Sequence, residues 1–468
     1  MAVTSSTSSG AWRPKSGEII FKLLTLIVIL SPLPLGSVKP WAWSLIAFLV
    51  SLLLLAWWAQ TRRHGDGQRI SLNRIKWVAF PYFAVMGWSL FQAYAPVPGF
   101  LAHPAWEDAS KALGYPLQSR ITADPEAAKG SFINLACYGA VFYLCLQLAQ
   151  DRKRAKALFL AITGMAAVSS VYGIVQYSMG GDSLLWYDLK DFTRGHAVRG
   201  TFVYKNAFAT YAGLSILCLL ALTSGKLSRM TLALESRNMT SSEKSAIYSE
   251  IFPFAIVFIT LFAALTLSMS RAGFACSCLA MAVYSVLHSR KQGWSMKSAL
   301  APLAALLLTG ILFHFMASAM ERRMQNLDKD SETREELYDM TLRGIWDAPL
   351  TGHGHGSFER NIRLFYPGDY TKNVNTAHNV YLDAAFELGI PSAFLLCVSI
   401  ISIGFISARG IWAEKTRIWS YSSAGVSAVI LIALHSLFDF SMQVPAVAIT
   451  FAAITGAACA RSLRSRNP

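Results

Sequence analysis

His378 is the residue whose type and setting most directly suggest acid–base chemistry. It is followed by Asn379 and Tyr381, and Glu387 lies further along the same segment. An imidazole titrates near neutral pH and can act as a general base. The alternative is an interfacial histidine that makes only a structural hydrogen bond. We expect His378 to be catalytic, with Asn379, Tyr381 and Glu387 as candidate substrate contacts.

An arginine stands between two long apolar stretches, where Ser270-Arg271 separates 251–269 from 272–288. An arginine at the centre of a membrane helix costs about 3 kcal/mol on insertion scales, so such residues are usually paired or functional. The alternative is a tight external turn whose side chain reaches water along its apolar stem. Arg271 is predicted to bind an anionic group.

A second basic segment precedes another apolar stretch. Arg199, Lys205 and Asn206 meet the start of the predicted span 205–224. Guanidinium and ammonium groups at a membrane face suit a phosphate or pyrophosphate group. A solvated loop is the alternative. We predict that these three residues bind substrate.

Residues 331–347 have the apolar spacing of an amphipathic helix, which places Arg334 and Arg343 on a surface helix. A glycine-rich loop, 352–356, follows, and glycine backbone can approach an anionic ligand closely. Arg334 is a candidate catalytic residue. Arg343, Gly354 and Gly356 are candidate substrate contacts.

Histidines also permit other interpretations. His353, His355 and His378 could form a zinc site, but two histidines separated by one glycine make a poor local clamp, and no nearby cysteine completes a set. No metal or other cofactor is therefore expected.

His435 and Asp439 are four residues apart, which predicts one helix face. They are either a structural pair or a pair that tunes the charge of a site.

The composition is that of a membrane protein. The 468 residues are 54% hydrophobic and 15% charged, with a mean hydropathy of +0.39, whereas soluble domains carry about 25% charged residues. This excludes an ordinary soluble enzyme, a disordered chain and a coiled coil. The net charge of +15 indicates basic cytoplasmic loops. Without a basic run interleaved with aromatics, no nucleic acid is expected as a partner.

A span needs about 20 mostly apolar residues, and this rule predicts an all-α polytopic protein with about twelve transmembrane helices. Short basic connections alternate with less basic ones, which places both termini in the cytoplasm. The predicted organisation is a cytoplasmic tail (1–18), nine transmembrane helices (19–316), a periplasmic helical cap (317–379), three further helices (380–460) and a cytoplasmic tail (461–468). The predicted spans are 19–37, 40–59, 77–95, 130–149, 157–178, 205–224, 251–269, 272–288, 298–316, 380–408, 419–438 and 444–460.

These motifs, in this order, resemble the O-antigen ligase and polymerase family of bacterial inner-membrane glycosyltransferases. The resemblance runs from about 199 to 390. It rests on the Ser270-Arg271 break, on Arg334, on the tryptophan- and glycine-containing segment 346–358, on 378–382 with 387–389, and on 200–202 with 206–209. His353 departs from the family pattern, which usually has an apolar or small residue there.

The resemblance implies a reaction at the periplasmic face of the bacterial inner membrane. A glycan passes from an undecaprenyl-diphosphate carrier to an acceptor hydroxyl, without a metal and with inversion at the anomeric carbon. Arg271 and Arg334, supported by Arg199, would stabilise the diphosphate. His378 would accept the hydroxyl proton or orient the acceptor.

Several functions share these features. An O-antigen ligase uses a lipid A core sugar as acceptor, a repeat-unit polymerase uses another lipid-linked glycan, and a third relative glycosylates protein. We favour the ligase-like interpretation. A secondary transporter is the alternative from another class, since about twelve spans and the central loop 225–250 fit it. However, transporters often contain internal repeats, none is evident here, and the longest connection is external.

Overall fold

The described part of the chain is helical almost throughout, which confirms the predicted all-α class. In this computed structural model, the described residues contain one β-hairpin, with two residues in each strand: β1 (Ser183–Leu184) pairs antiparallel with β2 (Tyr187–Asp188). The structure describes residues 15–64, 70–180, 183–185, 187–188, 197–235, 240–292, 310, 328–368, 370, 373–412 and 419–464.

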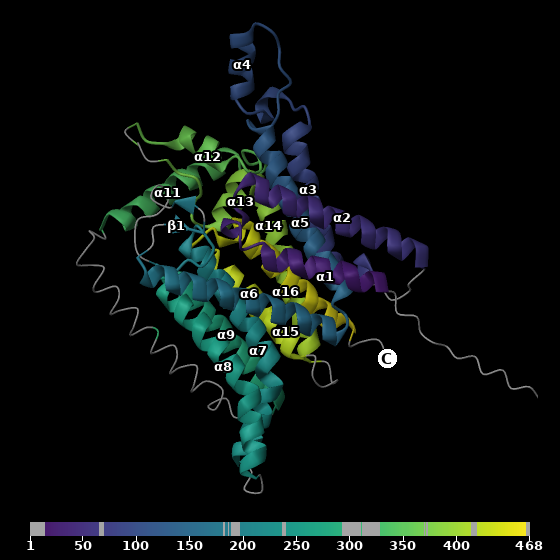
Figure 1. The fold of residues 1–468 in the computed structure, drawn as a ribbon. Coiled ribbons are helices and arrows are strands. Elements are labelled where there is room, and N and C mark those ends of the chain that lie inside the picture. Colours follow the sequence, from purple (N-terminus) through teal and green to yellow (C-terminus); the bar gives the residue numbers. More distant parts are fainter. Residues whose placement is uncertain are drawn as a thin grey trace, which may run out of the picture.

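The helices follow one another with mostly short connections (Figure 1). Their bounds are α1 (Lys15–Leu30), α2 (Pro40–His64), α3 (Lys76–Tyr94), α4 (Ala105–Leu113), α5 (Pro125–Leu148), α6 (Arg152–Ser178), α7 (Lys205–Glu235), α8 (Ser241–Leu267), α9 (Arg271–Gln292), α11 (Asp328–Asp347), α12 (Phe358–Asn361), α13 (Val380–Leu388), α14 (Ile390–Ile411), α15 (Trp419–His435) and α16 (Pro445–Arg464). Short 3₁₀ turns cover Leu35–Ser37, Leu72–Ile75, Gly99–Leu101, Ile362–Phe365 and Ser441–Gln443.

Eight of the described helices are long and apolar enough to cross a membrane: α2, α5, α6, α7, α8, α9, α14 and α16. The chain is therefore a multi-pass membrane protein. Helix α15 is apolar but shorter, at 17 residues. The predicted span 298–316 lies outside the described residues except for Gly310, so the count of about twelve stays a prediction.

The predicted tenth span, 380–408, is wrong as a single helix. It consists of α13 and α14, which are separated by Gly389 with φ +80°. A Cβ at Gly389 would collide with the carbonyl oxygen of Leu350 and lie 3.1 Å from the amide nitrogen of Gly352. Only glycine permits both this backbone conformation and this close approach.

The predicted shared helix face of His435 and Asp439 is also wrong. Helix α15 ends at His435, and Asp439 lies in the connection that precedes the Ser441–Gln443 turn. Apolarity continues past His435 in the sequence through Leu437 and Phe438, which is why a hydropathy rule extends the span too far.

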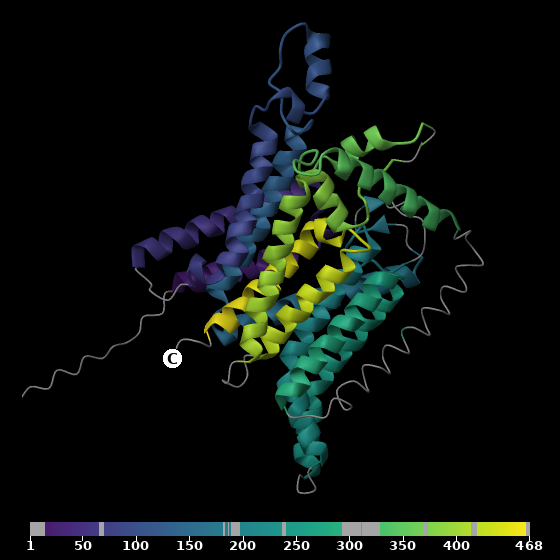
Figure 2. The ribbon, with the colours of Figure 1, turned by 180° about the vertical axis from the view of Figure 1, so that it is seen from behind.

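Helices α4, α11 and α12 lie at one end of the bundle, and the last turns of α7 and the first turns of α8 lie at the other (Figures 1 and 2). We call the first the cap end, and α11 and α12 the cap. At the opposite end, Arg461 of α16 donates to the carbonyl of Gln150, just after α5. Ser462 bonds there to Ser407 of α14 and Ser422 of α15. Helices α5, α14 and α16 therefore end at this side of the bundle, and α15 begins there.

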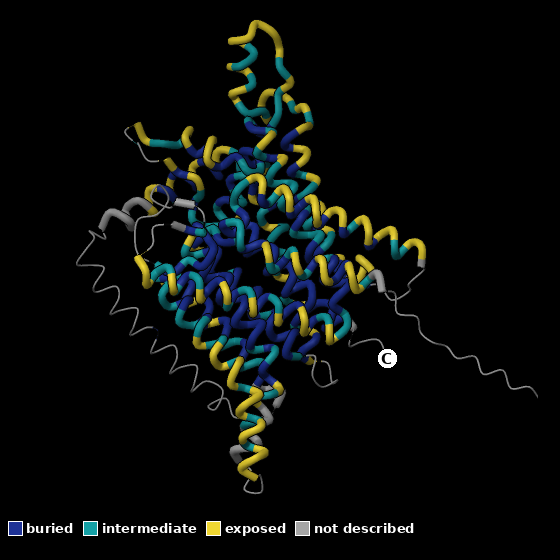
Figure 3. Tube along the Cα trace, viewed as in Figure 1, coloured by how far each residue is buried: buried dark blue, intermediate teal, exposed yellow. Residues whose placement is uncertain are grey.

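Helix α16 is enclosed by its neighbours, and the middle of the bundle is mostly buried (Figure 3). Its most apolar stretch is 100% buried and that of α7 is 89% buried, whereas that of α8 is only 17% buried. Helix α16 packs closely against α5 because its sequence is rich in alanine, glycine, serine and threonine. Small residues allow membrane helices to approach one another closely. The apolar outer face of α8 is left for lipid.

Candidate functional site

His378 occupies a turn just before α13, at the cap end. Its backbone is in the left-handed region, with φ +52°, which is uncommon for any residue other than glycine and costs on the order of 1–3 kcal/mol. Asn379 caps α13, because its side-chain oxygen accepts from the amides of Tyr381 (3.0 Å) and Leu382 (3.2 Å). The start of α13 therefore fixes the residue that follows the strained histidine.

The imidazole of His378 is not committed to a structural hydrogen bond. Its Nδ1 atom is buried and has no hydrogen-bond partner among the described residues. Its ring packs edge-on against Phe440 at 5.2 Å, and Phe440 packs against Tyr204 at 4.9 Å. Strain and an unpaired buried nitrogen together are typical of functional sites.

Two charged side chains act on this imidazole. Burial lowers the pKa of His378, the carboxylate of Asp439 raises it, and the guanidinium of Arg334 lowers it. Both charges therefore act on the imidazole electrostatically, and the packing of Phe440 on the ring places the segment that carries Asp439 beside the histidine turn. The net shift is downward, so His378 is neutral at pH 7.

Asp439 is held by the start of α7. It is 2% exposed, and its carboxylate accepts a hydrogen bond from Asn206 Nδ2 at 2.7 Å and another from the hydroxyl of Ser441. Asn206 therefore contacts the site through Asp439. The structure brings His378, Arg334, Asp439 and Asn206 together from four separate parts of the chain.

The other predicted basic residues lie on nearby connections at the cap end. Arg199 is half-buried, donates to the carbonyl of Val203 at 3.3 Å, and has a pKa lowered by burial. The amide of Val198 donates to the carbonyl of Leu267 at 2.9 Å, which joins the Arg199 segment to the turn before Arg271. The guanidinium of Arg271 is exposed and has no ion-pair partner in the described part of the chain.

Not every predicted residue gathers at His378. Lys205 opens α7 and is half-buried. Arg343 is exposed and pairs with Asp339 on its own helix, the kind of surface pair that contributes little to stability. Tyr381 donates its hydroxyl to the carbonyl of Ala433 at 2.8 Å, so it docks α13 on α15.

The glycine-rich loop is the joint between the cap and the membrane helices. The amides of His353 and Gly354 donate to the carbonyls of Phe386 and Glu387, both at 2.9 Å, and that of Ile390 donates to Pro349 at 2.9 Å. The first two bonds satisfy carbonyls at the end of α13 that its own helix leaves unpaired, and the third ties the start of α14 to the end of the α11 segment.

Polar side chains of α3 complete this joint. Trp88 donates its indole N–H to the carbonyl of Leu388 at 2.9 Å. Gln92 donates to the carbonyls of Thr351 (2.7 Å) and Glu387 (2.9 Å) and accepts from the amide of His355 at 3.2 Å. One buried amide thus joins three backbone groups of the loop and of α13.

The predicted glycines and acid belong to the same joint. A Cβ at Gly354 would meet Thr122, and one at Gly356 would meet Ser131, so close protein packing accounts for both glycines. Glu387 accepts from the amide of Phe358 at 3.1 Å, and burial raises its pKa to about 7. Substrate contact by these residues stays a prediction.

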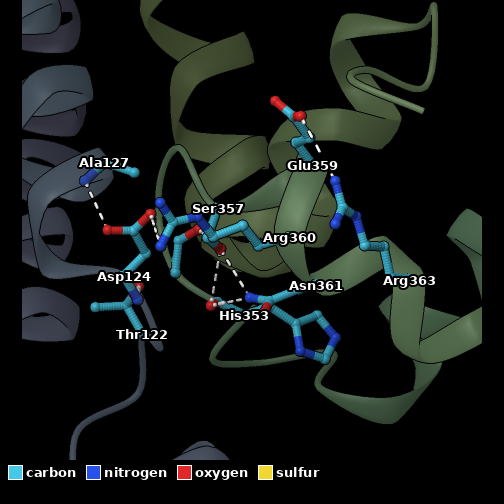
Figure 4. A network of polar contacts seen from close by, with 10 residues as sticks. Thr122, Asp124, Ala127, His353, Ser357, Glu359, Arg360, Asn361 and Arg363 are labelled. Carbon is cyan, nitrogen blue, oxygen red and sulfur yellow. Dashed lines mark hydrogen bonds and ion pairs between the residues drawn. The ribbon is translucent and has the colours of Figure 1, made fainter. Parts of the chain in front are cut away.

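Histidines of this loop have structural partners. His353 Nε2 lies 2.8 Å from the carbonyl oxygen of Gly344, and His355 Nδ1 lies 2.8 Å from Ser89 Oγ. Burial lowers the pKa of both, to about 4 for His355. Figure 4 shows the carbonyl of His353 between Ser357 and Asn361. In the described ranges, no three acidic, histidine or cysteine side chains are arranged to hold a metal.

An ion pair fixes the cap to α5. Arg360 reaches Asp124 at 2.9 Å, and Asp124 also caps α5 by accepting from the amide of Ala127 at 3.1 Å (Figure 4). The carboxylate is 9% exposed, so the pair is better shielded from solvent than the Arg343 pair.

A hollow of about 760 Å³ lies between α2 and α5. Its walls include Trp43, Phe48, Lys129 and Asn134. None of the residues predicted for the site lines it, so it is separate from the His378 cluster.

Gln92, Asp383 and Gln443 are polar residues of the site region that the motif analysis does not single out. In the sequence, Gln92 is an amide side chain within an otherwise apolar stretch, and this contrast could have marked it as a polar residue with a specific partner. Gln443 donates a hydrogen bond to Asp383 although 60 positions separate them in the chain. No local sequence pattern predicts such a contact.

The comparisons with known proteins agree with this architecture. Residues 256–397 match the family model described as O-Antigen ligase. This multi-pass helical membrane protein therefore contains an O-antigen ligase family domain. The family implies an enzyme of bacterial lipid-linked glycan transfer, of ligase or polymerase type. The match includes Arg271, Arg334 and His378 and excludes Asn206 and Asp439. No curated protein matches the chain.

Replacing Gln92 by methionine should loosen the cap. The change leaves the carbonyl of Thr351 and the amide of His355 without a partner, whereas the carbonyl of Glu387 keeps the amide of Gly354. Each buried unsatisfied group costs about 1–3 kcal/mol. We expect a lower thermal midpoint and faster proteolysis within 350–375. Gln118→Met, at an exposed position, is the control. Identical cleavage rates for the two variants would show that Gln92 does not hold the cap.

Proposed function

We propose that this chain transfers a glycan from undecaprenyl diphosphate to an acceptor hydroxyl at the periplasmic face of the inner membrane. The observation that carries this proposal is the strained, unpaired imidazole of His378 beside the carboxylate of Asp439 and the guanidinium of Arg334. A neutral base, a carboxylate and a cation are what proton removal opposite an anionic leaving group requires.

In the proposed step, the acceptor oxygen attacks the anomeric carbon of the donor sugar. A new carbon–oxygen bond forms while the bond from that carbon to the diphosphate oxygen breaks, and its electron pair stays with the lipid diphosphate. The hydroxyl proton passes to the imidazole of His378, where Asp439 stabilises the imidazolium. Attack opposite the leaving group inverts the anomeric carbon.

Arginines stabilise the diphosphate as it leaves. Arg271 and Arg334 are exposed, and neither forms an ion pair with a described residue, so their charge is available to an external anion. Arg199 supports them from its half-buried position, with Lys205 and Asn206 at the start of α7. Because these groups supply positive charge, and a diphosphate leaves without acid assistance, the proposed step uses no metal and no other cofactor.

The distribution of charge supports a periplasmic cap. The end of the bundle opposite the cap carries Arg62 near the end of α2, Lys76 at the start of α3, Arg152 at the start of α6 and Arg409 near the end of α14. Basic residues concentrate on cytoplasmic connections. We therefore place both termini in the cytoplasm and the His378 cluster at the periplasmic face.

Within this family, we propose a ligase that uses a lipid A core sugar as acceptor. A repeat-unit polymerase, with a lipid-linked glycan as acceptor, is the second candidate, and a protein-glycosylating relative shares the same donor. The O-antigen ligase domain supports transfer rather than secondary transport, since the matched segment contains the candidate catalytic residues.

A deletion strain separates ligase from polymerase. If the chain is a ligase, the strain should lose smooth lipopolysaccharide and accumulate long carrier-linked glycans, because polymerisation continues without transfer. Gel analysis of lipopolysaccharide and of extracted carrier lipids measures both. Accumulation of single carrier-linked repeat units would instead identify a polymerase.

His378→Ala should abolish transfer. A single general base contributes about 10²–10⁴-fold, so the rate with a purified carrier-linked donor should fall by at least 10²-fold at unchanged protein level. His103→Ala, in the loop before α4, is the matched control. Full activity of the His378 variant would remove this residue from the mechanism.

The pH profile should report both neighbouring charges. His378 acts only when neutral and its pKa is lowered, so activity should decline on the acid side of 6.5. Arg334→Gln removes a charge that lowers this pKa, so the decline should move to higher pH. Asp439→Asn removes a charge that raises it, so the decline should move to lower pH. Profiles normalised to their maxima measure the shifts, and unchanged positions would contradict the proposed electrostatics.

A further inference from the structure

A buried carboxylate lies directly behind the turn that carries His378. Asp383, in the first turn of α13, is 1% exposed. One of its oxygens, Oδ1, accepts from the amide of Ala377 at 2.7 Å, and the other, Oδ2, accepts from Gln443 Nε2 at 2.7 Å. The proposed chemistry uses neither Asp383 nor Gln443.

The first of these bonds restrains the strained backbone. Ala377 precedes His378, and its amide is held by the Asp383 side chain. Asn379 follows His378, and its carbonyl accepts from the Asp383 amide at 3.0 Å. Asp383 therefore holds the residues on both sides of a left-handed histidine. A conformation that costs free energy persists only where its surroundings fix it.

The second bond links two separate parts of the site. Gln443 ends the 3₁₀ turn that follows Asp439 and Phe440, and Ser441 of that turn donates to Asp439. The bond between Asp383 and Gln443 thus ties the His378 turn to the segment that carries the carboxylate and the ring beside the imidazole. It spans 60 positions in the sequence.

Docking of α13 does not depend on this link. The amide of Val380 donates to the carbonyl of Ser436 at 2.9 Å, and the hydroxyl of Tyr381 donates to Ala433 at 2.8 Å. Both contacts remain when Asp383 or Gln443 changes. Loss of the link should therefore free the histidine turn while the helix stays in place.

We infer that Asp383 and Gln443 are positioning residues that set the geometry between His378 and Asp439. The inference rests on the proposed function, because its readout is the transfer rate. A misplacement of about 1 Å in an active site costs on the order of 10²-fold in rate. The effect should fall on kcat, with the KM for the carrier-linked donor nearly unchanged.

The test is a variant series in purified full-length protein. Asp383→Leu removes both acceptors and should lower kcat on the order of 10²-fold. Asp383→Asn keeps an acceptor for Ala377 and, with the Gln443 amide reversed, a partner for that side chain, so most activity should remain. Gln443→Glu places two carboxyl groups together, and its kcat should fall as pH rises and both ionise.

A double variant that exchanges the amide and the carboxylate tests the link even if a single variant folds poorly. In the double variant Asp383→Asn/Gln443→Glu, the new amide donates to the new carboxylate, so the link is restored with its polarity reversed. Its kcat should recover toward that of the unmodified protein, and the decline at high pH should disappear. This outcome is required even if Asp383→Leu fails to fold.

Gln147→Met is the matched control. The Gln147 amide bridges the backbone of Ile70 at the opposite end of the bundle, with bonds of 3.2 and 2.7 Å. Its loss should lower the thermal midpoint and leave the kcat of the folded protein unchanged. An equal loss of kcat in this variant would show that Asp383 acts only through general stability.

His378→Ala, measured alongside, separates the two proposals. If that variant is inactive while Asp383→Leu and Gln443→Glu keep a normal kcat, the positioning role is wrong and the proposed function stands. If the His378 variant is fully active, the proposed function fails, and with it the positioning of His378 for catalysis.

Discussion

The carbonyl groups at the end of α13 need hydrogen-bond donors in a place where water is scarce, and much of the cap end follows from this requirement. The helix stops at Gly389, so its final carbonyls have no partner within it. The glycine-rich loop donates two backbone amides to them, and Trp88 and Gln92 donate from α3. A loop that brings its own backbone against another backbone must lack side chains at the contact. This explains Gly352, where a Cβ would collide with the carbonyl of Glu387.

The other end of the same nine-residue helix carries His378. Helix α13 is therefore a short rigid connection, anchored to the cap at its C-terminus and to the candidate site at its N-terminus. Asn379 caps it, Asp383 holds the turn that precedes it, and Tyr381 docks it on α15. The exposed arginines proposed for the site lie on other helices, Arg271 at the start of α9 and Arg334 on α11. Buried hydrogen bonds therefore fix the turn that carries the imidazole, and the two exposed arginines form no ion pair with a described residue.

Hydropathy predicted the membrane helices because burial in lipid requires long apolar stretches, and α2, α5, α6, α7, α8 and α9 overlap the expected ranges. It failed at Gly389 and after His435, where the chain stays apolar although the helix ends. Motif analysis selected His378 and Arg334 for one site, and the structure places an electrostatic influence of Arg334 on the His378 imidazole; their catalytic roles stay a prediction. It could not pair Asp439 with Asn206 or Asp383 with Gln443, since those contacts depend on tertiary packing. It could not foresee that Gly354 and Gly356 pack closely against Thr122 and Ser131; their contact with substrate stays a prediction.

The enclosed position of α16 has a consequence for how the protein is made. This helix follows every other described helix in the chain, yet it is the most enclosed of the candidate spans. A ribosome-bound intermediate that lacks it must leave the facing surfaces of α5 and α14 against lipid or against a biogenesis factor. Closure of the bundle is therefore coupled to late synthesis, and a truncated product would expose a seam of small residues suited to recognition by membrane quality control.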